Sequence, residues 1–128
     1  MKKLLYIIFI LIFIGLSNWV IAATYDDAFE EKTITAQNTF TDPIRAVPRE
    51  GGEGRLNISI VGTAFSGTVT LQRQYLNADV FTDTWLDVYT WTADKEDFLT
   101  EKSREVIYRI GVKTGEFAGT SVKVRLSK

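Results

Sequence analysis

Hydrophobic and polar residues alternate along most of the chain after residue 32. In RLNISIVG, residues 55–62, the apolar side chains of Leu56, Ile58 and Ile60 fall on one face, and polar side chains fall between them. The same period of two recurs in later segments, and it predicts strands with one buried and one solvated face. The expected strands are residues 33–40, 44–47, 55–62, 68–75, 85–92, 105–113 and 120–127.

Turn-forming residues separate these segments, and only residues 93–104 can be read as a helix, with Phe98 and Leu99 as an alternative short strand. Strands with one polar face predict an antiparallel sheet rather than a parallel sheet covered on both faces. We therefore expect residues 33–128 to form an all-β antiparallel β-sandwich of six to eight strands, Ig-like or jelly-roll-like, with a small barrel as the alternative. The residues expected in its core are Ile58, Ile60, Val69, Leu71, Tyr108, Ile110, Val122 and Val124.

The N-terminal residues have the order of a secretory signal peptide. Two lysines precede an apolar run, and Ala22 and Ala23 then offer small side chains at a cleavage site. The run is also long enough for an uncleaved anchor, so residues 1–23 are expected to be a signal peptide or membrane-anchor helix. Residues 24–32 would follow as an acidic leader. The expected location is the periplasm, the extracellular space or a cell surface, with a virion or a membrane as alternatives.

The sequence contains no Cys and no His. Disulfides and thiolate metal sites are therefore excluded, and the commonest general base and nucleophile–base pairs are missing. Loss of residues 1–23 would reduce the 15 basic residues to 13 against 16 acidic ones, a net charge of −3. That balance is not typical of nucleic-acid binding. We expect a protein that is not an enzyme and needs no cofactor.

Acidic residues cluster without the spacing of a known site. Asp79, Asp83 and Asp87 are the carboxylates that could hydrolyse a glycoside, but a polar loop made of turn formers is the favoured explanation for them. A calcium site could also draw on carboxylates, yet the spacing fits no EF-hand loop. The residues weighed for such a site are Asp79, Asp83, Asp94, Glu96 and Asp97. The expectation is no catalytic residue and no metal site.

An aromatic stripe is the sharpest candidate for binding. Trp85, Tyr89 and Trp91 are expected on one face of their strand, with Leu86 and Val88 on the other. If the stripe faces outward, it suits stacking on sugar rings or on another protein. If the stripe faces inward, it belongs to the core. Asp87 then lies on the same face and needs hydrogen-bond partners there.

Two loops add further candidate contacts. Residues 75–84 form a connection longer than the usual hairpin loop and include Tyr75 and Phe81. Phe117 lies in a loop with glycines near both ends. Each of these aromatic residues either meets a partner or folds back over the end of the sandwich. The complete set of candidate binding residues is Tyr75, Phe81, Trp85, Tyr89, Trp91 and Phe117.

Several strand signatures together resemble a known group of proteins. They are FSGTVTLQRQ at residues 65–74, a following Trp, YRIG at residues 108–111, and GEFAGTSVKVRLS at residues 115–127. This rhythm resembles small β-sandwich modules of tailed bacteriophages that are virion-associated or uncharacterised, and it covers about Leu56 to Ser127. The resemblance implies a structural or adhesive role and carries no catalytic residues. The loop at residues 75–84 departs from it, since the modules have a short Gly-rich hairpin there.

Two functions remain open at this point. The first is a non-enzymatic structural or adhesive protein, of phage or prophage origin, that acts at the surface of a particle or cell through a protein partner. The second is a secreted carbohydrate-binding module or small glycan-active protein. The chain could also form homo-oligomers, and it would meet a membrane only through uncleaved residues 1–23.

Overall fold

The computed structural model describes residues 28–46, 52–76 and 84–128, and every regular element in these ranges is a β-strand. In chain order the strands are β1 (Phe29–Ile34), β2 (Thr39–Phe40), β3 (Ile44–Arg45), β4 (Gly54–Phe65), β5 (Val69–Tyr75), β6 (Leu86–Trp91), β7 (Lys95–Glu101), β8 (Val106–Val112) and β9 (Gly119–Ser127). None of the described residues forms a helix that could cross a membrane. The expected signal or anchor helix at residues 1–23 lies outside the described residues.

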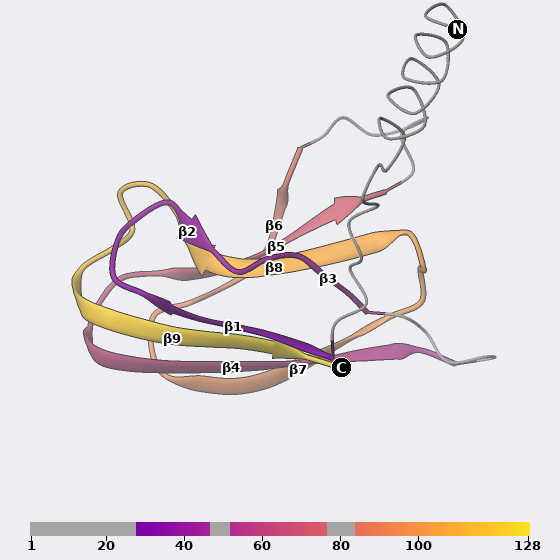
Figure 1. Cartoon of the computed structure of the whole chain (residues 1–128), viewed down its shortest axis with the longest axis horizontal. Helices are drawn as coiled ribbons and strands as arrows, with labels where there is room; N and C mark the ends of the chain where they lie inside the picture. Colours follow the sequence, from indigo (N-terminus) through magenta and orange to yellow (C-terminus); the bar gives the residue numbers. More distant parts are fainter. Residues whose placement is uncertain (1–27, 47–51, 77–83) are drawn as a thin grey trace, which may run out of the picture.

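The strands form two antiparallel sheets, which appear as the lower and upper layers in Figure 1. Sheet A has the order β1-β9-β4-β7, and sheet B has the order β2-β8-β5-β6, with β3 also paired to β8. Connections pass repeatedly from one sheet to the other, so strands that are distant in sequence become neighbours. Strand β9, at the C-terminal end, lies between β1 and β4. The fold is all-β and sandwich-like.

One hydrophobic core lies between the sheets and draws on both of them. Period-two alternation aims every second side chain inward, as in β4, where Leu56, Ile58 and Ile60 are at most 2% exposed. The eight residues predicted for the core are confirmed, because all of them are buried there: Ile58, Ile60, Val69, Leu71, Tyr108, Ile110, Val122 and Val124. A one-residue shift in register would turn such a set outward, so burial fixes the pairing of the central strands.

Two segments differ from the sequence-based expectation. Strand β1 begins at Phe29, inside the segment expected to be a leader, because residues 29–34 pair with β9 along their whole length. Residues 95–101 form edge strand β7, so the alternative of a strand at Phe98 and Leu99 is confirmed over a longer range and the helix does not form. Leu99 lies opposite Leu56 of β4 and packs against the core. Burial of that side chain and a ladder of backbone pairs outweigh the helix propensity of the surrounding Lys and Glu residues.

The turns at one end of the molecule require very close backbone approach. Gly119 has a φ of 110°, and a Cβ atom there would lie 1.9 Å from the carbonyl oxygen of Ala64. A Cβ on Gly67 would lie 2.1 Å from the carbonyl oxygen of Glu116. Only glycine fits such contacts. They hold the loop before β9 against the end of β4, where Phe117 can reach the core.

Candidate binding face

The outward side of β5 is covered although it faces away from the core. Leu71 points into the core, so its neighbours Thr70 and Gln72 point out of sheet B. A solvated face would leave them exposed, yet Thr70 is 0% and Gln72 6% exposed. Buried polar side chains need hydrogen-bond partners. The side chains that cover and satisfy these two residues form the candidate site.

Arg109 stands at the centre of this surface. It lies directly opposite Gln72 in the pairing of β5 with β8, and its Nε donates a 2.9 Å hydrogen bond to Gln72 Oε1. Its guanidinium carbon lies 4.3 Å from the ring centre of Phe40 and 4.1 Å from that of Trp85. Both distances suit cation–π contact. Burial lowers the pKa of Arg109, but a guanidinium stays protonated at neutral pH.

Asp87 continues the network from the neighbouring strand β6. Gln72 Nε2 donates to Asp87 Oδ1 at 2.8 Å, and Lys113 Nζ pairs with Asp87 Oδ2 at 2.8 Å. The bonds from Lys113 and Gln72 lower the pKa of Asp87, and the carboxylate in turn raises the pKa of Lys113. The carboxyl group is therefore ionised at neutral pH. Asp87 is the carboxylate that would need partners if the aromatic stripe faced inward. It has partners in Gln72 and Lys113, but on the outer face of sheet B and not in the core.

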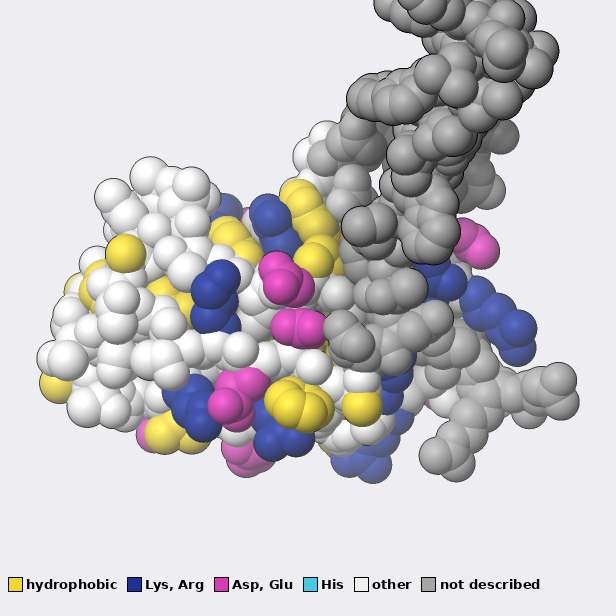
Figure 2. Space-filling view, in the orientation of Figure 1, with side chains coloured by type: hydrophobic (Ala, Val, Ile, Leu, Met, Phe, Trp, Pro, Cys, Tyr) yellow, Lys and Arg dark blue, Asp and Glu magenta, His cyan; other side chains and the backbone are white. Residues whose placement is uncertain are grey.

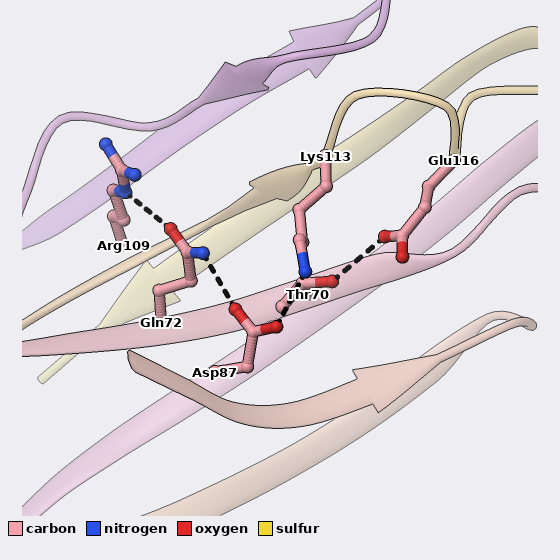
Figure 3. A network of polar contacts seen from close by, with 6 residues as sticks. All are labelled: Thr70, Gln72, Asp87, Arg109, Lys113 and Glu116. Atoms are coloured by element: carbon pink, nitrogen blue, oxygen red, sulfur yellow. Dashed lines mark hydrogen bonds and ion pairs between the residues drawn. The ribbon is translucent and has the colours of Figure 1, made fainter. Parts of the chain in front are cut away.

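Figure 3 shows the network running from Arg109 through Gln72 and Asp87 to Lys113, with Thr70 and Glu116 beside it. Thr70 Oγ1 donates to Glu116 Oε2 at 3.3 Å, which ties the loop after β8 to the start of β5. We call this surface the Arg109 face. It consists of Phe40, Thr70, Gln72, Trp85, Asp87, Arg109, Lys113 and Glu116. Its charges alternate in sign, and its shape is held by strands and internal bonds.

A hollow of about 470 Å³ adjoins the Arg109 face where β2 begins. Arg109 and Phe40 line it, together with Lys32 and the segment from Asn38 to Pro43. Lys32 Nζ donates to the carbonyl oxygen of Phe40 at 2.9 Å, which fixes the rim of the hollow. Volumes of about 300–1,000 Å³ are usual for ligand sites. The face therefore combines a hydrogen-bonded network with an adjacent hollow.

The predicted aromatic stripe is divided by a change of register in β6. Trp91 pairs with Val69 and Tyr89 with Leu71, but the next pair is Asp87 with Gln72, so Val88 has no partner. This bulge interrupts the alternation. Trp85 stacks on Arg109 outside the sheet, whereas Trp91 packs against the core. The expectation that Trp85, Tyr89 and Trp91 share one face is therefore wrong.

The other predicted aromatic contacts do not join the Arg109 face. Tyr75 and Phe117 are partly buried and pack against the core. The ring of Phe117 lies 5.7 Å from that of Phe65, so Phe117 folds over the end of the sandwich, which was one of its two expected placements. Phe81 and the cleavage residues Ala22 and Ala23 lie outside the described residues.

The described acidic residues weighed for calcium, Asp94, Glu96 and Asp97, do not form a metal site together. Asp94 Oδ1 accepts the backbone N–H of Gly62 at 2.7 Å, and Asp97 Oδ1 accepts that of Phe98 at 2.9 Å. Glu96 accepts a hydrogen bond from the Ser59 hydroxyl. Glu96 and Asp97 are consecutive in β7 and therefore point to opposite faces. Asp79 and Asp83 lie outside the described residues, and no group of three acidic side chains in the described ranges could hold a metal ion.

Several residues of the Arg109 face escaped sequence reasoning. Gln72 and Arg109 look like ordinary polar positions of alternating strands, and Phe40 lies at the end of a weak pattern. Their meeting depends on the register of β2, β5 and β8, which the sequence pattern does not specify. Of these residues, only Trp85 and Asp87 could be singled out from the sequence, because both belong to the predicted strand that holds the aromatic stripe.

No protein-family model, curated protein or solved structure shows a significant match to this chain. The chemistry of the Arg109 face must therefore be judged from its own groups. It offers a guanidinium, an ammonium group, two carboxylates and two aromatic rings in fixed positions. Those groups suit recognition by hydrogen bonds, charge and stacking. Acidic and basic side chains also lie close together on the side of the molecule shown in Figure 2.

Proposed function

We propose that this protein is a non-enzymatic adhesive module that attaches to a protein partner on the surface of a cell or particle. The strand orders of the two sheets support a jelly-roll sandwich, because joining the short strands β2 and β3 into one leaves two interlocked Greek keys. Export through residues 1–23 and an origin in phage or prophage remain part of the proposal. They rest on the leader and on the resemblance of the strand signatures.

The observation that carries the proposal is the stacking of Trp85 on Arg109 beside a satisfied polar network. Trp and Arg are the residue types that most often dominate binding energy at protein interfaces. Gln72 already holds Arg109 in place, so little side-chain freedom remains to be lost when a partner binds. A surface needed only for solubility would not require such order.

The same face argues against catalysis by its carboxylates. The lowered pKa of Asp87 keeps that group ionised at neutral pH, so it cannot serve as a general acid there. Both of its oxygens already accept hydrogen bonds. Together with the absence of His and Cys from the sequence, this supports a binding role over an enzymatic one.

Carbohydrate binding is the second candidate function. It is favoured by the position of Trp85, because an aromatic ring beside amide and carboxylate groups suits the apolar and hydroxyl faces of a sugar. A glycan partner would use the same outer surface of sheet B. The two candidates therefore share a site and differ in the partner.

The proposal is tested by attachment of the labelled full-length protein to intact cells and particles of the source strain, before and after their surface proteins are digested. Trp85→Ala should weaken attachment about 30-fold or more, the loss expected for a hot-spot residue. The matched control is Phe98→Ala, because Phe98 lies 4.2 Å from the guanidinium carbon of Arg55 on sheet A. Equal effects of the two substitutions would contradict the proposed face. Attachment that survives protein digestion but not deglycosylation would favour the glycan.

A further inference from the structure

A groove of about 330 Å³ opens along one side of the molecule, between β6 of sheet B and β7 of sheet A. Both strands lie at the ends of their sheets in the described strand order. Val88 and Tyr89 line the groove on one side, Leu99 and Glu101 line it on the other, and Arg73 and Tyr108 also contribute. We call this the edge groove. It shares no residue with the Arg109 face.

Charged residues occupy inward positions in the edge groove. Arg73 follows Leu71 by two residues in β5, and Glu101 follows Leu99 by two residues in β7, so each shares the face of a core-packing residue. A purely structural sandwich favours apolar residues at such positions. Local departures from the folding pattern tend to occur at functional sites. The alternative is that inward charges protect edge strands from aggregation.

A hydrogen bond between the sheets joins two polar groups of the groove, Tyr108 and Glu101. The Tyr108 hydroxyl donates to Glu101 Oε2 at 2.5 Å. Burial raises the pKa of Tyr108, and the hydrogen bond to Glu101 raises it further. The phenol therefore remains a donor at neutral pH. Glu101 also accepts the backbone N–H of Ser103 through Oε1 at 2.8 Å. The carboxylate is thereby fixed and keeps lone pairs for further donors.

We propose that the edge groove binds a single neutral pyranose ring. Tyr89 is 55% exposed at the rim and is backed by Trp91, whose ring centre lies 6.0 Å away. It can cover the apolar face of a sugar while Arg73 donates to hydroxyl oxygens and Glu101 accepts from hydroxyl groups. Arg73 and Glu101 balance each other, and Lys102, which also lines the groove, is paired with Glu53 at 3.2 Å. This balance suits a neutral ring better than a uronate. The volume lies at the lower end of the range for ligand sites.

This inference goes beyond the proposed attachment to a protein, and it concerns a different surface. The test is to titrate the full-length protein with glucose, galactose, N-acetylglucosamine and glucuronate. Binding is measured by saturation-transfer NMR and by calorimetry. At least one neutral sugar should bind. Tyr89→Ala should weaken that binding about 3- to 10-fold through lost stacking, and Arg73→Met about 10-fold or more through lost charged hydrogen bonds.

Two control variants distinguish binding in the edge groove from binding elsewhere on the protein surface. Phe98→Ala removes an aromatic ring of nearly equal exposure, 54%, from sheet A, and Trp85→Ala changes only the Arg109 face. Both should leave sugar affinity unchanged; a loss of affinity in Trp85→Ala would place the sugar on the Arg109 face instead and would also overturn the proposal. The proposal is overturned if no neutral sugar binds, if glucuronate binds more tightly than glucose, or if Phe98→Ala acts like Tyr89→Ala. It is also overturned if Arg73→Met self-associates at unchanged sugar affinity, because the charges would then only protect the edge.

Discussion

Replacement of Gln72 by Met should destabilise the protein through the network that it bridges. Met keeps the length of the side chain but neither donates to Asp87 nor accepts from Arg109, so two hydrogen bonds to charged groups are lost. Gln72 itself is only 6% exposed, so water cannot take its place without rearrangement. The loss should fall on the folded state, because the unfolded chain makes no such bonds.

The free-energy cost of Gln72→Met depends on how well water can solvate Asp87 and Arg109 once their bonds to Gln72 are lost. A hydrogen bond to a charged group contributes about 1.5–3 kcal/mol, so the gross loss is about 3–6 kcal/mol. The Asp87 side chain is 43% exposed and keeps its bond to Lys113, so solvent recovers much of that loss. Met also buries additional apolar surface. We therefore expect a net cost of about 1–2 kcal/mol.

Urea denaturation of the full-length protein measures this cost. With a slope of about 1–3 kcal/mol per molar urea for a small protein, the midpoint should fall by roughly 0.3–2 M. Gln74→Met is the matched control, since Gln74 is the next outward residue of β5 and lies outside the network. If the two substitutions shift the midpoint equally, the bonds of Gln72 do not stabilise the Arg109 face.

Three further predictions concern the core, the acid limit and a turn. Leu71→Ala should cost about 2–5 kcal/mol in urea denaturation, whereas Leu86→Ala, at a position 43% exposed on the adjacent strand, should cost less than about 1 kcal/mol. Lys113 and Gln72 lower the pKa of Asp87 in the folded protein. The Asp87 carboxylate therefore contributes fully to folding stability above its unfolded pKa of about 3.9, and this contribution is lost as pH falls through the folded pKa. Parent and Asp87→Asn should therefore differ in melting temperature at pH 7 and converge below about pH 4; a difference that grows on acidification would refute this. Gly119→Ala should destabilise more than Gly115→Ala, which meets no atom within 4 Å and should cost only about 1–2 kcal/mol of backbone strain.

Burial explains which parts of the fold could be predicted from the sequence. The central strands β4, β5, β8 and β9 each turn one apolar face into the core, so their core residues can be predicted from alternation, although β5 and β8 are covered on the outer face as well. Strand β7 lies at an edge, and Leu99 is the residue that anchors it to the core. One apolar anchor among charged residues is equally compatible with a helix. Edge strands therefore carry too little pattern to be assigned by sequence alone.

The bulge at Val88 explains why the aromatic residues predicted on one face of their strand lie on two. Alternation assumes that each residue pairs once, and an unpaired residue reverses the direction of every side chain before it. Trp85 therefore lies on the outer face with Arg109, whereas Trp91, predicted to be its neighbour on the same face, packs against the core. Arg109 and Gln72 could not be named, because their contact is set by the pairing of β5 with β8. The alternation pattern of one sequence does not show which residues of two strands lie opposite each other.

Footprinting of the attached protein by hydroxyl radicals tests the central claim most directly. Modification of Trp85 and Phe40 should fall several-fold when the full-length protein is bound to its cell or particle, because both rings flank Arg109. Phe29 and Phe98, which lie on sheet A and are 52% and 54% exposed, should be modified at the same rate in the free and attached states. Protection of Phe29 and Phe98 with unchanged modification of Trp85 and Phe40 would contradict the assignment of the Arg109 face as the binding surface.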